Sequence, residues 1–336
     1  MTNVALIGYG YWGPNLARNL HELPNCRLQV CCDLDEGRLA LAQTRFPHIR
    51  VTTRFDDVLQ DGDIQAVVIA TPARTHFALT KAALRAGKHV LVEKPLAMSS
   101  QEALELIDVA REAQRVLMVG HTFEYNPAVL KIKELLKDNQ LGDIYYAYST
   151  RVNLGRVQRD LNALWSIAPH DISILLFLLE EMPVEVSARG ASHLDRSIED
   201  VVFVDFLFPG GVTAHVHVSW LDPSKVRRMT IVGSKKMVVY DDLETEGKVK
   251  VYDKGVLKVG DGQIFGEFQY RLHTGDIYIP KIDMSEPLRN ECAHFLECIE
   301  KQKQPQTDGA SGLRVIKVLE AAQESLRRRG APVEIS

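Results

Sequence analysis

The first 120 residues alternate short, uniformly apolar runs with stretches of helical periodicity. The apolar runs are Val4–Ile7, Leu28–Cys32, Ala66–Ala70, His89–Val92 and Val116–Gly120, with a shorter one near Val51. The helical stretches between them are Asn15–Leu20, Gly37–Arg45, His76–Ala86 and Ser100–Ala113. Strands that are apolar on both faces and separated by helices are typical of a parallel sheet covered on both sides. The pattern predicts a doubly wound α/β domain, which binds ligands at the carboxyl ends of its strands.

The pattern changes after about Asn126. Two helical stretches, Pro127–Lys137 and Ile167–Leu179, accompany a series of strand signals, and two more helices close the chain at Pro287–Lys301 and Gly309–Arg329. The strand signals are Ile144–Asn153, Val184–Ala188, Val201–Phe208, Val212–Trp220, Met229–Val232, Lys236–Tyr240 and Val249–Tyr252. Short turns between strands of alternating polarity indicate a mostly antiparallel sheet. We therefore expect a first domain at 1–122 and an α+β domain with an open sheet at 123–336, with the C-terminal helices able to pack back on the first domain.

The composition excludes several classes of partner. Hydrophobic residues make up 46% and charged residues 25%, the balance of a soluble globular protein. A net charge of -4 gives no electrostatic basis for binding nucleic acid or an anionic membrane. No apolar run reaches the roughly 18 to 20 residues of a membrane span, and the first strand begins too early to leave room for a leader. The five cysteines have no metal-like spacing. We expect a cytoplasmic protein.

A glycine motif marks the nucleotide end of the predicted sheet. Gly8, Gly10 and Gly13 form a G-x-G-x-x-G that follows the first strand and opens a helix. These glycines permit a tight turn, close approach of a pyrophosphate and close helix–strand packing, and the helix N-terminus attracts the pyrophosphate. Asp33 ends the second strand, 20 residues after Gly13, where a carboxylate binds the ribose 2′-hydroxyl and repels the 2′-phosphate of NADP. The motif predicts a Rossmann domain that binds NAD.

Two further strand ends carry polar residues toward the same crevice. One is Ala70-Thr71-Pro72, followed by His76, and the other is Glu93-Lys94-Pro95. Burying a lysine ammonium is costly unless a partner compensates it, so a Glu-Lys pair at a strand end indicates function. From spacing alone, a solvated ion pair at the rim remains the alternative.

With these segments and Ala86–Val90, the chain resembles the Gfo/Idh/MocA oxidoreductases, which are sugar and inositol dehydrogenases with a Rossmann domain and an α/β substrate domain. The resemblance covers essentially the whole chain, including Asp308-Gly309 before the last helix. It implies that Lys94 lies beside the nicotinamide and the substrate hydroxyl. The cofactor-binding residues that the motifs and the resemblance imply are Gly8, Gly10, Tyr11, Trp12, Gly13, Asp33, Ala70, Thr71, Pro72, His76, Glu93 and Lys94.

The second catalytic segment of the family has the form D-x-G-x-H, and the matching stretch here runs from Trp165 to Ser173. His170 takes the position of the family histidine, but Ser166 stands where many members carry an aspartate. Three alternatives follow: His170 acts without the aspartate, or Asp171 or the Ser166 hydroxyl takes over part of its role. Without the resemblance, His170 is equally well explained as a structural histidine.

The segments Gly10–Asn15 and Trp165–Asp171 resemble one branch of the family, the UDP-N-acetylglucosamine 3-dehydrogenases. The resemblance implies an NAD-dependent dehydrogenase that oxidises a ring hydroxyl of a nucleotide sugar at C3, with Lys94 and His170 as catalytic residues. An inositol or free-sugar dehydrogenase is one alternative. An NAD-dependent glycosidase that oxidises C3 transiently belongs to another class and would form no net NADH.

Additional positions are candidates for binding. Polar residues after the strand that enters the second domain can clamp hydroxyls or a diphosphate, and Tyr125 lies at the domain junction. Together with the catalytic residues, the substrate-binding candidates are Lys94, Tyr125, Arg151, Asn153, Arg156, Trp165, Ser166 and His170. His215 and His217 share a strand face but have no third ligand at suitable spacing, so we expect no metal.

The second sheet also predicts self-association. Apolar residues at alternate positions of two neighbouring strands exceed what one layer of helices would cover, which predicts a homodimer or homotetramer formed sheet to sheet. These residues are Val204, Phe206, Phe208, Val216 and Val218.

Overall fold

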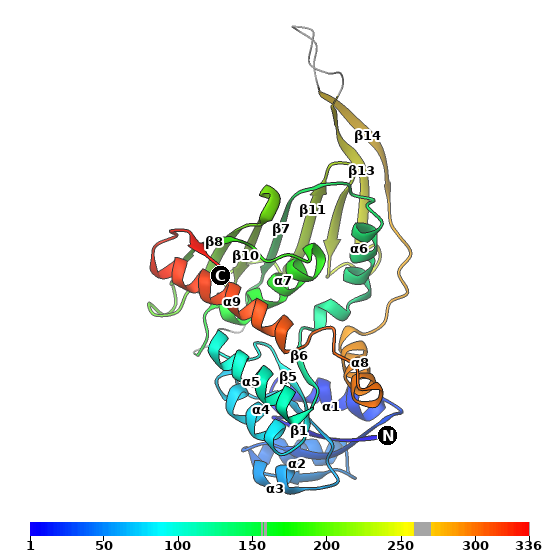
Figure 1. Cartoon of the computed structure of the whole chain (residues 1–336), viewed down its shortest axis with the longest axis vertical. Helices are drawn as coiled ribbons and strands as arrows, with labels where there is room; N and C mark the ends of the chain where they lie inside the picture. Colours follow the sequence, from blue (N-terminus) through cyan, green and yellow to red (C-terminus); the bar gives the residue numbers. More distant parts are fainter. Residues whose placement is uncertain (156, 158–159, 259–269, 336) are drawn as a thin grey trace. The chain divides into compact units, whose positions relative to one another are not determined.

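A computed structural model describes residues 1–155, 157, 160–258 and 270–335 of the chain (Figure 1). The chain forms two compact units. Unit 1 comprises residues 1–126 and 285–320, and unit 2 comprises residues 127–284 and 321–336. The C-terminal part of the chain therefore returns to the first unit before it ends in the second.

Unit 1 is built on a six-stranded sheet in which every pairing is parallel, in the order β3-β2-β1-β4-β5-β6. The strands are β1 (Thr2–Ile7), β2 (Cys26–Cys32), β3 (Arg50–Thr52), β4 (Ala66–Ile69), β5 (His89–Glu93) and β6 (Leu117–Gly120). This order reverses direction between β1 and β4, as in a doubly wound fold that binds a ligand at the point of reversal. The predicted Rossmann domain is confirmed.

The helices of unit 1 follow the strands in turn. They are α1 (Gly13–Glu22), α2 (Glu36–Arg45), α3 (Phe55–Gln60), α4 (His76–Arg85), α5 (Ser100–Ala113), α8 (Pro287–Lys301) and the first part of α9 (Gly309–Arg327), with short 3-10 turns η1 (Ala73–Thr75) and η2 (Thr122–Tyr125). Helix α8 contacts α1 and η2 and adds Leu288, Cys292, Phe295 and Leu296 to the core formed around β1 and β2. Unit 1 is thus completed by residues that lie more than 150 positions downstream.

Unit 2 contains a nine-stranded sheet in the order β14-β13-β12-β11-β7-β10-β9-β8-β15. The pairing is antiparallel except between β7 and β10. The strands are β7 (Ile144–Val152), β8 (Glu185–Ala191), β9 (Val201–Leu207), β10 (Thr213–Ser219), β11 (Val226–Gly233), β12 (Met237–Asp241), β13 (Val249–Lys258), β14 (Tyr270–Tyr278) and β15 (Val333–Glu334), with the turn η3 (Pro209–Gly211) between β9 and β10. The predicted mostly antiparallel α+β domain is confirmed.

Two helices of unit 2, α6 (Pro127–Lys137) and α7 (Ala163–Leu179), pack together, and α7 covers β7, β9 and β10 on one face of the sheet. The apolar residues of β9 and β10 point toward this helix and are at most 4% exposed: Val204, Phe206, Phe208, Val216 and Val218. The expectation that these residues form an uncovered apolar surface is wrong, because α7 is long enough to bury them. The opposite face carries aromatic residues that are roughly two-fifths exposed, among them Tyr146, Tyr148 and Phe203.

Three elements do not match any predicted segment: α3, β14 and β15. In β14 large apolar side chains are exposed, Leu272 by 79% and Ile277 by 52%, so burial does not impose an alternating pattern on it. Strands β13 and β14 extend beyond the rest of the sheet as a two-stranded ribbon (Figure 1). Within the described part of the chain, no helix is both long and apolar enough to span a bilayer.

Candidate active site

The glycine loop lies at the carboxyl end of β1. Gly8 has φ +96°, and a Cβ there would lie 2.7 Å from the carbonyl oxygen of Ala70 at the end of β4. A Cβ on Gly13 would lie 2.4 Å from the Gly8 carbonyl oxygen. At Gly10, by contrast, the nearest atom to such a Cβ is the Arg38 guanidinium, 3.7 Å away. Gly8 and Gly13 are therefore required by protein packing, whereas the space beside Gly10 is open to a ligand.

The N-terminus of α1 is suited to an anion. Its first turn contains no acidic residue, and no side chain caps its N–H groups. Pro14 occupies the first turn, where its missing N–H costs nothing. The Asn15 and Leu16 N–H groups donate to the Trp12 carbonyl oxygen, so it is mainly the helix dipole that favours a pyrophosphate at this position.

Asp33, just beyond β2, holds the glycine loop in place. Its carboxylate accepts the backbone N–H of Tyr9 at 2.6 Å and that of Asp35 at 2.9 Å. The Arg38 guanidinium lies 3.6 Å from the same carboxylate. Sequence analysis did not single out Arg38, although its place in the first turns of α2 brings it to the same edge of the sheet.

His76, in the first turn of α4, connects two strand ends. One ring nitrogen lies 2.7 Å from the Pro95 carbonyl oxygen and the other 2.9 Å from the Thr71 carbonyl oxygen. Burial lowers the pKa of His76 below 6.5, while these two hydrogen bonds oppose the shift. Because both ring nitrogens are engaged by backbone carbonyls, His76 fixes the loop after β4 against the turn after β5. The Thr71 hydroxyl in that loop bonds the Thr75 hydroxyl at 2.7 Å.

Glu93 and Lys94 lie where β5 ends. The Glu93 carboxylate accepts the backbone N–H of Lys94 at 3.3 Å and the indole N–H of Trp12 from the glycine loop. Loss of hydration raises the pKa of Glu93 to about 7, against the opposing effect of the Lys94 charge. The glycine loop and the Glu-Lys pair are thus linked through Trp12, whereas Tyr11 of the same loop is 81% exposed.

Two buried residues that sequence analysis did not predict lie beside this pair. His121 follows β6, is 1% exposed, and neither of its ring nitrogens has a hydrogen-bond partner within the described chain. Burial and the nearby Lys94 charge lower the pKa of His121 to about 3. Glu291 of α8 is fully buried and accepts the Thr122 hydroxyl at 2.9 Å. No local sequence signal identifies Glu291, because it reaches the site from a distant helix.

Tyr125 lies in the interior of unit 1. It is 5% exposed, and its hydroxyl lies 2.9 Å from the Thr307 hydroxyl and accepts the Thr307 backbone N–H at 3.3 Å. The substrate contact expected for Tyr125 would require this hydroxyl to leave Thr307.

In unit 2, helix α7 carries the segment that resembles the second catalytic motif. Asn162 caps the helix, since its side-chain oxygen accepts the Trp165 backbone N–H at 3.0 Å. The cap starts the helix four residues before the predicted Ile167, so that His170 lies in its third turn. Ser166 precedes His170 by one turn and therefore shares its face. Trp165 and Ser166 are buried, and His170 is partly exposed.

Arg151 and Asp171 form a buried ion pair between β7 and α7. The Arg151 Nε atom lies 2.5 Å from one Asp171 carboxylate oxygen, and the Ser149 hydroxyl donates to the other, also at 2.5 Å. The positive charge of Arg151 is thereby compensated inside the protein. Asn153, after β7, is partly exposed, and Arg156 is outside the described residues.

The His215 and His217 side chains lie on the outer face of the sheet. The His215 ring is 2.8 Å from the Asp205 carboxylate, and the His217 ring stacks on Phe203. Across the described residues there is no group of three or more histidine, cysteine, aspartate or glutamate side chains that could hold a metal ion.

Two family models match the chain in succession. Residues 2–121 match the oxidoreductase family model with an NAD-binding Rossmann fold, and residues 129–239 match the Gfo/Idh/MocA C-terminal domain. The protein belongs to the Gfo/Idh/MocA oxidoreductase family.

Individual Gfo/Idh/MocA proteins are similar over much or all of the chain. The UDP-N-acetylglucosamine 3-dehydrogenase of Acidithiobacillus ferrooxidans is 28% identical over 76% of each chain, and its solved structure has a TM-score of 0.81 over 97% of this chain and 98% of that one. The inositol 2-dehydrogenase 2 of Saccharopolyspora erythraea is 31% identical over 64% of this chain and 66% of its own. GenD2 from gentamicin A biosynthesis, solved with NAD, is 26% identical with a TM-score of 0.83 over 100% of this chain and 96% of that one.

Membership in the Gfo/Idh/MocA family makes the protein an oxidoreductase that binds NAD. The residues of unit 1 fit this cofactor, because the space beside Gly10 is open, the α1 N-terminus is uncapped, and Asp33 lies at the end of β2.

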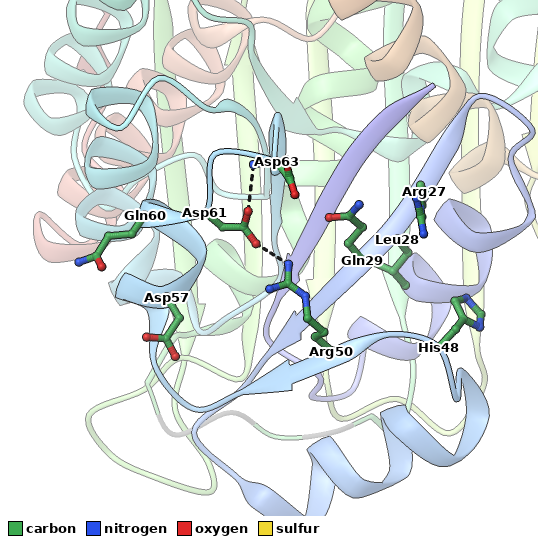
Figure 2. Close-up of a pocket in the computed structure, with 9 residues that line it drawn as sticks. All are labelled: Arg27, Leu28, Gln29, His48, Arg50, Asp57, Gln60, Asp61 and Asp63. Carbon is green, nitrogen blue, oxygen red and sulfur yellow. Dashed lines mark hydrogen bonds and ion pairs between the residues drawn. The ribbon is translucent and has the colours of Figure 1, made fainter.

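A separate hollow of about 680 Å³ lies at the other edge of the Rossmann sheet (Figure 2). It is bordered by the first half of β2 and by the loop before β4, so it faces away from the glycine loop at the carboxyl ends of the same parallel strands. Arg50 points to Asp61 within it and forms an ion pair (Figure 2). The lining residues are Arg27, Leu28, Gln29, His48, Arg50, Asp57, Gln60, Asp61 and Asp63. This hollow is not part of the cofactor crevice.

Proposed function

We propose that the protein is an NAD-dependent dehydrogenase that oxidises the C3 hydroxyl of a nucleotide sugar such as UDP-N-acetylglucosamine. The observation that carries the proposal is the position of Lys94, beside the partly exposed Glu93 at the same edge of the sheet as the glycine loop. The similarity of the whole chain to the UDP-N-acetylglucosamine 3-dehydrogenase of Acidithiobacillus ferrooxidans supports the substrate.

The cofactor is proposed to lie along the carboxyl edge of the Rossmann sheet. The glycine loop and the α1 N-terminus would bind the pyrophosphate, Asp33 the adenosine ribose, and the loop after β4 the far half of the molecule. We assign His76 a positioning role, because its ring holds Thr71 against Pro95. Bound NAD supplies the hydride acceptor for the reaction.

The proton chemistry is assigned to Lys94 and His170. Oxidation of an alcohol requires a base that takes the hydroxyl proton, and a histidine is suited to this at neutral pH. His170 is proposed as that base. Lys94 would donate a hydrogen bond to the same oxygen and stabilise its developing negative charge.

Many family members carry an aspartate at the position of Ser166, and the surroundings of Asp171 and Ser166 suggest which of these two residues takes over its role. The Asp171 carboxylate is engaged by Arg151 and Ser149, so its charge is already balanced within unit 2. We therefore propose that Asp171 does not assist His170. The Ser166 hydroxyl, one helical turn away on the same face, is the proposed replacement.

An inositol is the second candidate substrate. The similarity to the inositol 2-dehydrogenase 2 of Saccharopolyspora erythraea favours it, at 31% identity over a shorter part of the chain. Inositols and sugars both present secondary ring hydroxyls, so the same two catalytic groups would serve either.

We also propose that the protein forms a homodimer or homotetramer through the outer face of its second sheet. This face carries partly exposed aromatic residues on β7 and β9, including Tyr146, Tyr148 and Phe203. Tyr146 and Tyr148 also line a hollow of about 520 Å³. Partly exposed aromatic side chains are enriched at protein interfaces. Sedimentation at micromolar concentration tests this proposal, and a monomer would refute it.

A substrate screen tests the proposed activity. The protein is incubated with NAD and with UDP-hexosamines, UDP-hexoses or inositols, and the absorbance of NADH is followed. NADH formation with UDP-N-acetylglucosamine and oxidation at C3 are the expected results. NADH formation with inositols alone would favour the second candidate. Release of free sugar without net NADH would instead identify a glycosidase with transient oxidation.

A further inference from the structure

A partly exposed carboxyl group, Glu93, and a fully buried one, Glu291, lie close together at the carboxyl ends of β5 and β6. Glu93 ends β5 and is paired in register with Gly120 at the end of β6. Because Gly120 has no side chain, the Glu93 carboxyl can lie across it; a Cβ at Gly120 would be 3.2 Å from its Oε2 atom. Glu291 reaches the same strand end from α8, where the Thr122 hydroxyl donates to it at 2.9 Å. Residues almost 200 positions apart thus bring two acids together.

Glu93 and Glu291 have different charged neighbours. Glu93 faces the Lys94 ammonium, the Lys94 backbone N–H and the Trp12 indole N–H. Glu291 faces two further acidic groups, Glu93 and Glu124. One Glu291 oxygen, Oε1, has no hydrogen-bond partner among the described residues. Glu291 therefore has one neutral donor, the Thr122 hydroxyl, and two acidic neighbours, which is poor stabilisation for a buried carboxylate.

This environment favours the protonated form of the acids. Burial and the Glu93 charge hold the pKa of Glu291 well above 4.5, and burial raises the pKa of Glu93 to about 7. The neighbouring His121 is neutral, with a pKa lowered to about 3, and burial raises the pKa of the adjacent Cys292 thiol. Neither supplies a countercharge. Two interacting carboxyl groups titrate as a pair. The pair formed by Glu93 and Glu291 therefore holds at least one proton at neutral pH.

We propose that Glu93 and Glu291 form a proton-holding pair that responds to the oxidation state of the cofactor, releasing a proton when NAD⁺ is bound and keeping it when NADH is bound. This inference rests on the proposed function, which places the nicotinamide beside Lys94. The nicotinamide ring of NAD⁺ is cationic and that of NADH is neutral. The negative charge left on the pair therefore balances the positive charge of the NAD⁺ nicotinamide ring, which adds to that of Lys94. Glu291 acts as a positioning residue.

The expected number of protons released follows from the positive charge of the NAD⁺ nicotinamide ring. A positive charge within a few ångströms lowers a carboxyl pKa by about 1 to 3. Burial raises the pKa of Glu93 to about 7, so NAD⁺ binding should release part of a proton at pH 7. The affinity for NAD⁺ should consequently rise with pH, by at most about tenfold per pH unit for one proton released, and the affinity for NADH should not.

Calorimetry of cofactor binding tests the proposal. The binding heats of NAD⁺, NADH and ADP-ribose are measured at pH 7 in two buffers that differ in ionisation enthalpy, which yields the number of protons released. ADP-ribose carries every part of NAD⁺ except the nicotinamide. Proton release with NAD⁺ that exceeds that with NADH and ADP-ribose is expected. Equal release with all three ligands would overturn the proposal.

Two variants locate the proton. Glu93→Gln keeps the shape of the side chain but removes the carboxyl group whose pKa burial raises to about 7, so the extra release at pH 7 should disappear. Glu300→Gln, at an exposed position of α8, is the control and should behave like the wild type. Undiminished release in Glu93→Gln would contradict the proposal.

A measurement on the wild-type protein tests the proposal even if Glu93→Gln does not fold. The infrared carbonyl band of a protonated carboxylic acid should weaken when NAD⁺ is added and remain with ADP-ribose, and a band that NAD⁺ does not change would oppose the proposal. All these measurements omit substrate, so they do not depend on the sugar that is oxidised. Proton release without any dehydrogenase activity would refute the proposed function and leave this inference standing.

Discussion

The Asp33 carboxylate accepts the backbone N–H of Tyr9 at 2.6 Å, so the acid that ends β2 also fixes the glycine loop after β1. Its position 3.6 Å from the Arg38 guanidinium gives the proposed adenosine end of the crevice one negative and one positive group. The negative charge of Asp33 repels a ribose 2′-phosphate, while Arg38 can bind one once that charge is gone.

Asp33→Asn should therefore raise the use of NADP relative to NAD by about tenfold or more, the effect of removing roughly 1.4 kcal/mol of repulsion. The amide oxygen can still accept the Tyr9 N–H, so the loop should be retained. The ratio of kcat/KM for the two cofactors measures the effect. Asp56→Asn, which removes an exposed acid of α3, should leave the ratio unchanged. An unchanged ratio in Asp33→Asn would contradict this role.

Two glycines of the same loop should respond differently to one added methyl group. Gly10→Ala meets no protein atom closer than 3.7 Å, so it should weaken NAD binding by about tenfold or more with little effect on Tm. Gly13→Ala would place its Cβ 2.4 Å from the Gly8 carbonyl oxygen, and such overpacking costs about 1 to 3 kcal/mol. Calorimetric Tm and NAD titration separate the two effects. Normal NAD affinity in Gly10→Ala would argue against a pyrophosphate there.

Removing a proposed proton-transfer group should lower turnover while cofactor binding persists. Lys94→Ala and His170→Asn should each reduce kcat by about 10² to 10⁴-fold, the usual effect of general acid–base catalysis. The Kd for NAD should change far less, since the glycine loop and Asp33 are intact. Lys301→Ala, at an exposed position of α8, serves as the control. Near-wild-type turnover in either variant would remove that residue from the mechanism.

The ion pair between Arg151 and Asp171 should be sensitive to the loss of one partner. Arg151→Met leaves the Asp171 charge buried, which should cost about 3 to 5 kcal/mol of unfolding free energy. The double variant Arg151→Met, Asp171→Leu removes both charges and should recover most of that loss. Urea denaturation measures both. A double variant no more stable than the single one would show that the pair contributes more than charge compensation.

The acids Glu93 and Glu291 should make stability depend on pH. Their pKa values are raised above the unfolded value near 4.5, so the folded state binds more protons above that pH. Their contribution is complete below about pH 4.5 and is lost as pH rises through about 7 for Glu93 and higher for Glu291. Glu291→Gln should therefore gain stability relative to wild type between pH 5 and pH 8 in urea denaturation. A stability difference that is constant with pH would contradict the raised pKa values.

Periodicity predicted most elements of the fold because burial leaves a clear pattern. The strands of unit 1 are covered on both faces, and the predicted α5, α6 and α8 coincide with the observed helices. Strand β14 escaped prediction for the opposite reason, since Leu272 and Ile277 are exposed and nothing selects an alternating pattern.

Short local motifs were enough to predict which strand ends carry the glycine loop and Glu93-Lys94, and their roles stay predictions. Contacts between distant parts of the chain could not be predicted. The Tyr125 hydroxyl lies 2.9 Å from the Thr307 hydroxyl, 182 residues away, and the substrate contact of Tyr125 stays a prediction. No local sequence pattern marks Glu291, because its importance depends on its position at the ends of β5 and β6, which are distant in the sequence.

The order in which the two units occur along the chain constrains how the protein can be made. Unit 1 consists of residues 1–126 and 285–320, with residues 127–284 synthesised between them. A ribosome adds about 5 to 20 residues per second, so the Rossmann sheet must wait on the order of ten seconds or more for the α8 residues that complete its core. During this interval the apolar surface that α8 later covers is exposed on the nascent chain. The enzyme should therefore depend on chaperones during synthesis, and truncation before Ser285 should prevent stable folding even of the cofactor-binding unit.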